Sequence, residues 1–444
     1  MSKSTSSTKS KALKWSAVFL LLAAVANAAA VPQSDAVAFE TQSQLQQSLG
    51  LQKIPAVRNP KFTENGAAAI AKAQAKYGFK STHATGPVND QVIGTTPAAS
   101  DNGDLEYLVQ VPIGTPPQTL NLDFDTGSSD LWVFSSKLPA SSKSGHSIFT
   151  SAASSTFKAL TGYSWSIEYA DLSTASGTVG TDNVNLGGLV VKNQAVELAT
   201  QASASFIRNN NDGLVGLGFW NGQYGNTVKP TSQKNVIANL ISQGTVPANA
   251  QLFTTALYSS RDSASSFYTF GYVDQSLVSA SGQAISWTPV DSSLGFWQVP
   301  STTTYVGGKA ITQSGNTGIA DTGTTLALLS DTVVNAVYAL IPGSSYSTAD
   351  EGYIFPFSSA KSLPTVTIAI GNKQFAIQPE DLIYGTSKDG SQYFGGIQSR
   401  GDSSFDILGD VFLKSVYAIF DQGNTRLGLV PKIEATQHLT GRDE

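Results

Sequence analysis

The chain has 444 residues, more than one ordinary domain holds, and 41% of them are apolar, enough for a substantial core. It contains no Cys and three scattered His, which excludes disulfides, thiol nucleophiles and Cys-based zinc sites. Residues 1–91 carry 10 Lys and Arg against 4 Asp and Glu, a net charge of +6, whereas residues 92–444 carry 17 against 28, a net charge of −11. Such an acidic body argues against nucleic-acid binding. We expect a chemistry of carboxylates and hydroxyls, with no metal and no organic cofactor.

Residues 1–28 have the pattern of a secretory signal peptide. Four lysines, the last of them Lys14, precede a short apolar run at 16–25, and Ala-Asn-Ala at 26–28 fits a small-x-small cleavage site. The alternative is a membrane anchor, which needs about 18 or more apolar residues, and this run is shorter. We therefore expect a secreted, extracellular protein without membrane contact after signal removal, and a vacuolar destination is the alternative.

Residues 29–95 differ in composition from the rest and are predicted to form a pro-segment. An Ala-rich helix is expected from Gly66 to Tyr77, with Gly78 as its C-cap, followed by a turn-rich stretch typical of an exposed linker. One interpretation is a solvated helical arm. The other is a removable segment whose positive charge is attracted to the acidic body. At the opposite end of the chain, residues 433–444 form a polar tail.

From about Leu105 onward the sequence predicts a mainly β protein. Apolar and polar residues alternate with period two at 120–125. Two helices are expected among the strands, one over 333–341 with caps at 330 and 331, and a shorter one over 235–242. Similar strands recur between turn-rich segments, at 165–169, 189–191, 267–270, 365–370 and 417–420.

Two motifs occur twice in the same order along the chain. Asp125-Thr-Gly-Ser-Ser recurs as Asp321-Thr-Gly-Thr-Thr, and an apolar-apolar-Gly triplet that ends at Gly216 recurs at Gly409. The triplet's glycine follows the aspartate by 91 residues in the first copy and by 88 in the second. The matched order and spacing imply two related lobes. We place these lobes at 96–275 and 276–432 and expect them to face each other across a pseudo-twofold axis.

Such an axis brings Asp125 beside Asp321, and two adjacent carboxyl groups do not both ionise at low cost. One keeps its proton while the other is charged, so the pair offers an acid and a base together. It can deprotonate a bound water and protonate a carbonyl oxygen, as amide hydrolysis without a covalent intermediate requires. The pair titrates as a unit, so the sequence leaves open which aspartate holds the proton. Hydroxyl groups that can donate to the carboxylates or to nearby carbonyls follow each aspartate, at Thr126, Ser128, Thr322 and Thr324.

These residues resemble the pepsin-like aspartic proteases, and most of all their secreted fungal branch of penicillopepsin and aspergillopepsin. The resemblance covers about residues 105–431 together with the layout of a precursor. It implies a mainly β, bilobal pepsin-like fold, in which two pseudo-twofold-related lobes enclose a deep cleft. The motifs that carry it are FDTGSSDLWVF at 124–134, WSIEYAD at 165–171, DGLVGLGF at 212–219, ADTGTT at 320–325 and ILGDVFLKSVYAIFD at 407–421.

The resemblance also implies roles for individual residues. Asp125 and Asp321 match the catalytic pair. Thr126 and Thr322 match hydroxyls that link the two loops, and Ser128 and Thr324 match hydroxyls that support the carboxylates. Trp132 matches a tryptophan that hydrogen-bonds the tyrosine of the flap, a hairpin over the cleft. Substrate contacts fall to positions in the two loops and in the flap: Gly127, Gly323, Thr325, Tyr169 and Asp171. In fungal relatives the acid at the place of Asp171 permits a basic side chain before the scissile bond.

A further pair of residues matches the family's pro-segments. Lys76-Tyr77 resembles their lysine-tyrosine pair, in which the lysine sits on the catalytic carboxylates. We therefore expect the Lys76 ammonium to lie between Asp125 and Asp321. Inhibition by this segment should be relieved in acid, because protonation of carboxylates removes their attraction while the lysines stay charged.

The chain departs from the family pattern in two places. The flap usually has Tyr-Gly-Asp-Gly, but Ala170 and Leu172 stand at the two glycine positions. We expect negative φ at both, since a residue with a Cβ avoids positive φ. The loss of both glycines leaves the primary specificity open. Close fungal relatives often carry a disulfide whose positions match Phe357 and Tyr393. We expect these two rings in offset or edge-to-face contact, with centroids about 4.5–7 Å apart.

Together these features predict an aspartic endopeptidase, made as a zymogen, that hydrolyses internal peptide bonds at acidic pH. It should prefer hydrophobic residues around the scissile bond, with acceptance of Lys as an option. The expected partners are protein and peptide substrates, pepstatin-type inhibitors and its own pro-segment, and the enzyme is expected to be a monomer. Two alternatives stay open. One is a phosphatase-type hydrolase that uses an Asp nucleophile and magnesium, by analogy with residues 123–127; the other is a catalytically inactive pepsin-like binding or inhibitor module.

Overall fold

The computed structural model describes residues 33–59, 65–83, 106–168, 174–208, 211–221, 225–261 and 264–433. The predictions for the signal peptide at 1–28, for most of the linker and for nearly all of the polar tail fall outside these ranges. The flap residues Tyr169, Ala170, Asp171 and Leu172 also lie outside them. Their conformation therefore stays a prediction.

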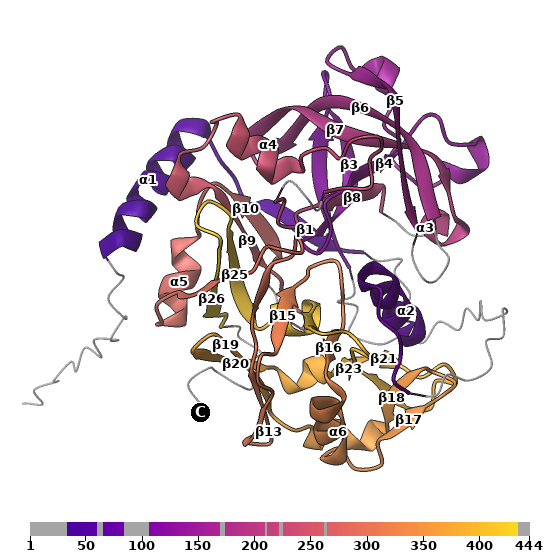
Figure 1. Ribbon diagram of the computed structural model, residues 1–444, viewed down its shortest axis with the longest axis vertical. Coiled ribbons are helices and arrows are strands. Elements are labelled where there is room, and N and C mark those ends of the chain that lie inside the picture. Colours follow the sequence, from indigo (N-terminus) through magenta and orange to yellow (C-terminus); the bar gives the residue numbers. More distant parts are fainter. Residues whose placement is uncertain are drawn as a thin grey trace, which may run out of the picture.

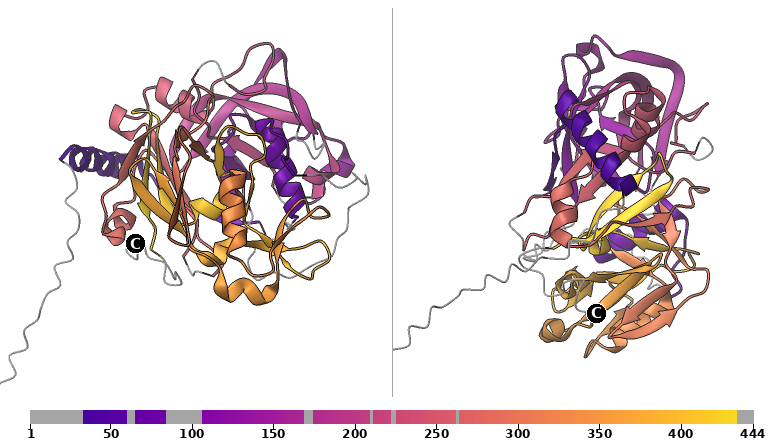
Figure 2. Two further views of the ribbon diagram at one scale, coloured as in Figure 1. Left: turned by 60° about the horizontal axis from the view of Figure 1, so that its bottom comes forward. Right: turned by 90° about the vertical axis from the view of Figure 1, so that its left-hand side faces the viewer.

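Strands dominate the described chain, as the sequence predicts, and they build two lobes (Figure 1). Figure 2 shows the same two lobes from two other sides. The strands of the N-terminal lobe are β2 (Tyr107–Ile113), β3 (Gln118–Asp125), β4 (Leu131–Phe134), β5 (Lys158–Glu168), β6 (Thr174–Leu186), β7 (Leu189–Ala202) and β8 (Gly213–Gly216). Those of the C-terminal lobe are β12 (Gln298–Pro300), β13 (Thr303–Val306), β14 (Lys309–Thr312), β15 (Thr317–Ala320), β16 (Ala327–Leu329), β17 (Ser345–Ser347), β18 (Gly352–Phe355), β19 (Val366–Ile370), β20 (Lys373–Ile377), β21 (Ile383–Thr386), β22 (Tyr393–Gly395), β23 (Ile397–Ser399) and β24 (Asp406–Leu408).

One long sheet connects the lobes and contains a strand from the expected pro-segment. Its order is β11-β26-β25-β9-β10-β1-β2-β3-β8-β4-β7-β6-β5. In β1, Ile54 lies opposite Tyr268 of β10, and Ala56 lies opposite Val109 of β2. The sequence did not predict this strand, which joins the two halves of the sheet. The strands not yet bounded are β1 (Ile54–Arg58), β9 (Leu252–Ala256), β10 (Phe267–Phe270), β11 (Ser286–Pro289), β25 (Val416–Asp421) and β26 (Arg426–Pro431).

The same strand arrangement occurs once in each lobe, as the repeated motifs predict. In the N-terminal lobe β3 runs parallel to β8, with Asp125 opposite Gly216, and β4 pairs antiparallel with β8. In the C-terminal lobe β15 runs parallel to β24, with Ala320 opposite Leu408, and β16 pairs antiparallel with β24. Each apolar-apolar-Gly triplet therefore supports the strand that leads into its own Asp-Thr-Gly loop. This duplication confirms the prediction of two related lobes.

The helices agree with the sequence in part. The Ala-rich helix α2 ends at Gly78, which caps it with φ 70°, and Asn65 caps its start through a side-chain hydrogen bond. The helix α6 stops before the predicted end, because Leu340 and Ile341 form tighter bonds to residues three positions back. The sequence reading missed α1, a largely polar helix of 17 residues, and three helices of at most 7 residues. The helices of the described chain are α1 (Gln33–Leu49), α2 (Gly66–Tyr77), α3 (Ala204–Arg208), α4 (Val236–Ser242), α5 (Gln275–Ser281), α6 (Asp331–Ala339) and α7 (Asp410–Leu413).

The helix α2 packs against the C-terminal lobe through a cluster of apolar side chains. Ile70 and Ala73 of the helix and Phe79 just after it are buried together with Tyr384 and Phe394 of the lobe. This packing fixes the direction of the last helical turn, which carries the Lys-Tyr pair. No helix in the described ranges is both long and apolar enough to cross a membrane.

The aromatic pair predicted at the disulfide positions is present. The rings of Phe357 and Tyr393 have centroids 4.6 Å apart and planes inclined by 74°, an edge-to-face contact. Phe357 is 44% exposed, so the pair lies at the surface of the lobe. The predicted contact between these two rings is thereby confirmed.

Candidate active site

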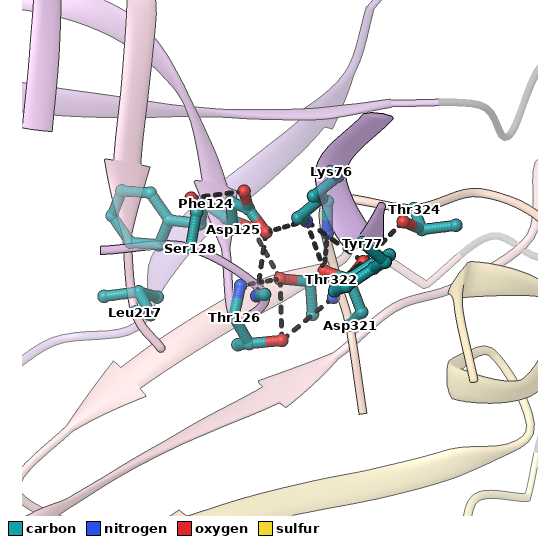
Figure 3. Close-up of polar contacts among 12 residues, drawn as sticks. Lys76, Tyr77, Phe124, Asp125, Thr126, Ser128, Leu217, Asp321, Thr322 and Thr324 are labelled. Carbon is teal, nitrogen blue, oxygen red and sulfur yellow. Dashed lines mark hydrogen bonds and ion pairs between the residues drawn. The ribbon is translucent and has the colours of Figure 1, made fainter. Parts of the chain in front are cut away.

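The two repeated aspartates lie close together, and both contact the Lys76 ammonium (Figure 3). Asp125 is the last residue of β3, and Asp321 follows directly after β15, so each stands where a strand turns into a Gly-containing loop. Asp125 is 3% exposed and Asp321 is fully buried. The two carboxyl groups lie within hydrogen-bonding contact of each other. The topology therefore brings together the pair that the sequence placed 196 positions apart.

Each carboxylate is held by its own loop in the same way. Asp125 accepts hydrogen bonds from the Gly127 amide at 2.8 Å and from the Ser128 hydroxyl at 2.5 Å. Asp321 accepts them from the Gly323 amide at 3.0 Å and from the Thr324 hydroxyl. These donors fix the plane of each carboxyl group, and they reproduce the pseudo-twofold relation at the level of single bonds.

The glycines of the two loops allow the loops to approach closely. A Cβ at position 323 would overlap the carboxyl group of Asp125, and a Cβ at position 127 would lie 2.5 Å from Asp321 Oδ1 and 2.6 Å from Lys76 Nζ. Real Cβ atoms do not come so near to other atoms. Gly127 and Gly323 are therefore required by this cross-lobe contact, whatever their role toward a substrate.

Two threonines link the loops across the pseudo-twofold axis. The Thr126 amide donates to Thr322 Oγ1 at 3.1 Å, and the Thr322 amide donates to Thr126 Oγ1 at 3.0 Å. Each hydroxyl in turn donates to a carbonyl of the opposite strand, Thr126 to Ala320 at 2.8 Å and Thr322 to Phe124 at 2.5 Å. The two loops are thus clamped to each other by four reciprocal hydrogen bonds that are all buried.

Lys76 and Tyr77 of α2 cover the pair, as Figure 3 shows. Lys76 Nζ lies 2.6 Å from Asp125 Oδ1 and 2.9 Å from Asp321 Oδ1, and its side chain is 7% exposed. The Tyr77 hydroxyl donates to Asp321 Oδ2 at 2.6 Å. The predicted position of the Lys76 ammonium between the two aspartates is therefore confirmed.

The two aspartates have opposite pKa shifts in this state. Burial, together with the neighbouring Asp321, raises the pKa of Asp125 although Lys76 acts against it. Burial alone would also raise the pKa of Asp321, but Lys76 and the hydrogen bonds from Asp125, Thr324 and Tyr77 lower it. With these neighbours, ionisation of Asp321 is favoured over ionisation of Asp125. Burial lowers the pKa of Lys76, yet the two carboxylates outweigh that effect and raise it, so the ammonium stays charged.

The predicted hydrogen bond between Trp132 and the flap tyrosine stays a prediction, because the tyrosine is not described. Trp132 is buried on β4, and its indole N–H has no hydrogen-bond partner among the described residues. The predicted partner, Tyr169, lies outside those residues, as does Asp171. Thr325, the remaining predicted substrate contact, is half-buried and directly follows Thr324.

Three neighbours of the site were missed by the sequence reading. The Tyr77 ring makes edge contacts with Phe296 at 5.3 Å and with Phe405 at 5.8 Å between centroids. Neither residue belongs to a repeated motif, so no signal in the sequence assigns them to the site. Asp123 is buried two residues before Asp125, and burial raises its pKa. Here a signal existed, since residues i and i+2 of a strand share one face.

The described residues contain no group of three or more His, Asp or Glu side chains that would hold a metal ion. The groups that form the site are its two carboxyl groups, the hydroxyls beside them and the Lys76 ammonium.

The eukaryotic aspartyl protease family matches residues 106–432, which is most of the chain. The chain belongs to this family. It is 42% identical over 367 residues to aspergillopepsin-1 of Aspergillus pseudoglaucus, which covers 82% of this chain and 87% of that relative. Penicillopepsin-1 of Penicillium janthinellum is 43% identical over 344 residues, covering 77% and 98%, and endothiapepsin of Cryphonectria parasitica is 40% identical over 390 residues, covering 85% and 89%.

A solved structure supports the same conclusion for the fold. The crystal structure of aspartic proteinase from Irpex lacteus matches with a TM-score of 0.60 at 26% sequence identity, covering 75% of this chain and 96% of that one. The pepsin-like bilobal fold is thus confirmed, and the protein is an aspartic-type peptide hydrolase. The phosphatase-type alternative has no support in this family or fold. Both loops keep their aspartate and hydroxyl, which leaves no reason to favour an inactive binding module.

Proposed function

We propose that this aspartic protease is made as a secreted zymogen and cleaves internal peptide bonds in acid once its pro-segment leaves the cleft. The observation that carries the proposal is the Lys76 ammonium on both carboxyl groups. Lys76 lies before residue 106, where the match to the protease family begins. An ammonium in this place excludes the water that the pair would activate. The signal-like pattern of residues 1–28 supports secretion.

In the proposed reaction, the charged aspartate accepts a proton from a water bound between Asp125 and Asp321. The water oxygen forms a bond to the scissile carbonyl carbon, and the protonated aspartate donates its proton to the carbonyl oxygen. The C–N bond then breaks as the nitrogen receives the proton taken from water, and the hydroxyl proton returns to the pair. The hydrogen bonds from Gly127, Ser128, Gly323 and Thr324 hold the carboxyl groups in the plane that this exchange needs.

The surroundings of Tyr77 support a preference for hydrophobic residues around the scissile bond. Its ring occupies an aromatic pocket beside Asp321, formed by Phe296 and Phe405. When α2 leaves, this pocket is free for an apolar side chain of an extended substrate. Tyr169 and Asp171 of the flap and Thr325 remain our proposed further contacts, and acceptance of Lys would depend on Asp171. We also propose that the enzyme acts as a monomer and binds pepstatin-type inhibitors.

The test uses the purified full-length chain, moved from neutral buffer to about pH 4, where carboxyl groups begin to protonate. Cleavage of an internally quenched peptide should appear, and pepstatin should block it. Asp125→Asn and Asp321→Asn should each abolish cleavage, since each removes the one-proton pair. Asp291→Asn, which changes an exposed aspartate, serves as the matched control and should leave it intact. Near-normal turnover by Asp321→Asn would refute the proposed roles.

A further inference from the structure

A second pair of carboxyl groups is buried in the N-terminal lobe, apart from the catalytic pair. Asp130 stands just before β4 and is 4% exposed, and Glu197 lies on β7 and has no exposed surface. The two strands run parallel and side by side, with Trp132 opposite Glu197. This register places the buried carboxyl groups of Asp130 and Glu197 beside each other, and each of them shifts the pKa of the other. No part of the proposed catalytic cycle uses them.

The two members of this pair differ in the donors around them. Asp130 Oδ1 accepts hydrogen bonds from the Thr227 amide at 2.6 Å and from the Thr227 hydroxyl at 2.9 Å. Neither oxygen of Glu197 accepts a well-formed hydrogen bond from an amide or hydroxyl of the described residues, although the Leu131 amide lies near. Two carboxyl groups in contact bond to each other only if one carries a proton. The member without donors keeps the proton, because nothing else stabilises its charge.

We propose that Asp130 and Glu197 share one proton, which Glu197 holds. This proton stabilises the contact between the first active-site loop and β5, the strand that leads into the flap. The connection passes through Thr227, which donates to Asp130. Two residues further on, the Lys229 amide donates to the Ser164 carbonyl at 2.8 Å, and the Ser164 amide donates back to the Lys229 carbonyl at 3.1 Å. Ser164 belongs to β5, the strand that leads into the flap. Asp130 is therefore a positioning residue, and Glu197 acts through it.

Among the described residues, no ion pair joins a cation to either member of this pair. The charges that shift its pKa values are carboxylates: Asp130 raises the pKa of Glu197, and Asp125 raises that of Asp130. Other charged side chains on the elements packed against it are exposed or have a partner of their own: Lys137, Lys158, Glu168, Lys192, Lys229, Asp182 with Thr156, and His146 with Asp212.

The shared proton makes the lobe sensitive to pH. Burial, and then the neighbouring Asp130, raise the pKa of Glu197 well above its ordinary value of 4.5. Above that value the unfolded chain has lost the proton while the folded chain still holds it, so unfolding releases about one proton. The contribution of the Glu197 proton to the free energy of unfolding therefore falls as pH rises. Once the folded chain also loses the proton, two buried carboxylates repel each other and the hold on Thr227 weakens.

The experiment replaces Glu197 by glutamine, which has the shape of a protonated glutamate and donates a hydrogen bond at every pH. Urea unfolding of the full chain is followed by tryptophan fluorescence from about pH 4.5 upward, in an Asp321→Asn background that prevents self-cleavage. We expect Glu197→Gln to unfold like its parent at the acid end. At higher pH the logarithm of its unfolding constant should increase with pH less steeply than that of the parent, by about one per pH unit, because its unfolding releases one proton fewer. The exposed-site variant Asp291→Asn controls for the loss of a carboxyl group.

An unchanged pH slope in Glu197→Gln would overturn the proposal, and so would a variant that is strongly destabilised at the acid end. Infrared spectra provide a second measurement that needs no unfolding. The band of a buried, protonated carboxyl group should persist near neutral pH in the parent and diminish in Glu197→Gln. If Glu197→Gln does not fold, the same spectra of Asp130→Asn decide the matter, because the asparagine amide lets Glu197 ionise and the band should again diminish. A parent without this band would refute the shared proton. The shared proton and the proposed catalytic roles can therefore fail independently of each other.

Discussion

Replacement of Lys76 by methionine tests directly how α2 closes the active site. Methionine keeps the unbranched stem and the helix propensity but removes the ammonium that contacts Asp125 and Asp321. Without it, the main cause that lowers the pKa of Asp321 is gone. The pair then takes up its proton at higher pH than in the parent. We expect Lys76→Met to become active at higher pH, which is the opposite of a simple loss of function.

The size of the effect follows from the geometry. Lys76 Nζ lies 2.6 Å and 2.9 Å from the two carboxylates, and its side chain is 7% exposed, so solvent screens these contacts little. At an effective dielectric constant of about 20, each contact is worth roughly 6 kcal/mol before desolvation. Desolvation of the charges offsets much of this, and removal of one partner of a buried ion pair costs about 3–5 kcal/mol. The equilibrium constant for binding of α2 in the cleft should fall by a factor of about one hundred to several thousand.

The assay records cleavage of a quenched peptide by freshly diluted precursor over a series of pH values, beside gels that report self-processing. Lys80→Met is the matched control, because it removes the same charge from an exposed side chain four residues further on. Lys76→Arg retains a positive charge and should stay closer to the parent. If Lys76→Met and the parent become active at the same pH, the ammonium does not control the site and the reasoning is refuted.

Three further variants test other parts of the structure. Thr322→Val leaves one buried amide and one buried carbonyl unpaired at the centre of the molecule, and should lower the free energy of unfolding by about 2–4 kcal/mol in urea titrations. Burial alone would lower the pKa of His146, but bonds to Asp212 and to two backbone carbonyls raise it. Its stabilisation is complete below its ordinary value of 6.5 and is lost as pH rises through the folded value, so His146→Gln should lower the free energy of unfolding in acid and approach the parent as pH rises through that range. A double-mutant cycle on Phe357 and Tyr393 should give a coupling of about 0.5 kcal/mol, the low end for an aromatic pair because Phe357 is largely exposed, and no coupling would show that the contact carries no energy.

Much of the site could be predicted because its Asp-Thr-Gly motif and the triplet that follows occur twice in the sequence. One Asp-Thr-Gly is compatible with any surface turn, but two copies with equally spaced partners require two similar strand arrangements. The structure shows these as the parallel pairs β3–β8 and β15–β24, which place Asp125 and Asp321 face to face. The position of Lys76 was predictable only through the family resemblance, since its spacing alone did not distinguish it from the other lysines of the segment.

The features that sequence reading missed depend on contacts between distant segments. The strand β1 has five residues with a proline among them, and it forms because β2 and β10 present open edges on both its sides. The pocket around Tyr77 combines aromatic residues more than 100 positions apart. Asp130 precedes an apolar strand and Glu197 lies within another, and no motif contains both. Only the register of β4 with β7 brings the two residues close together. Local patterns contain none of this information.

The pro-segment is attached in two ways that respond differently to acid, and this predicts the order of events on activation. α2 is held at the dyad by ion pairs, which weaken when Asp125 and Asp321 are protonated. β1 is held by backbone hydrogen bonds to β2 and β10 and by the buried side chains of Ile54 and Ala56, none of which titrates. Acid should therefore free the cleft while β1 stays in the sheet. Hydrogen–deuterium exchange during acidification should show the amides of 54–58 still protected when peptide cleavage begins. If protection and inhibition are lost at the same rate, the two attachments are released as one unit and this order is wrong.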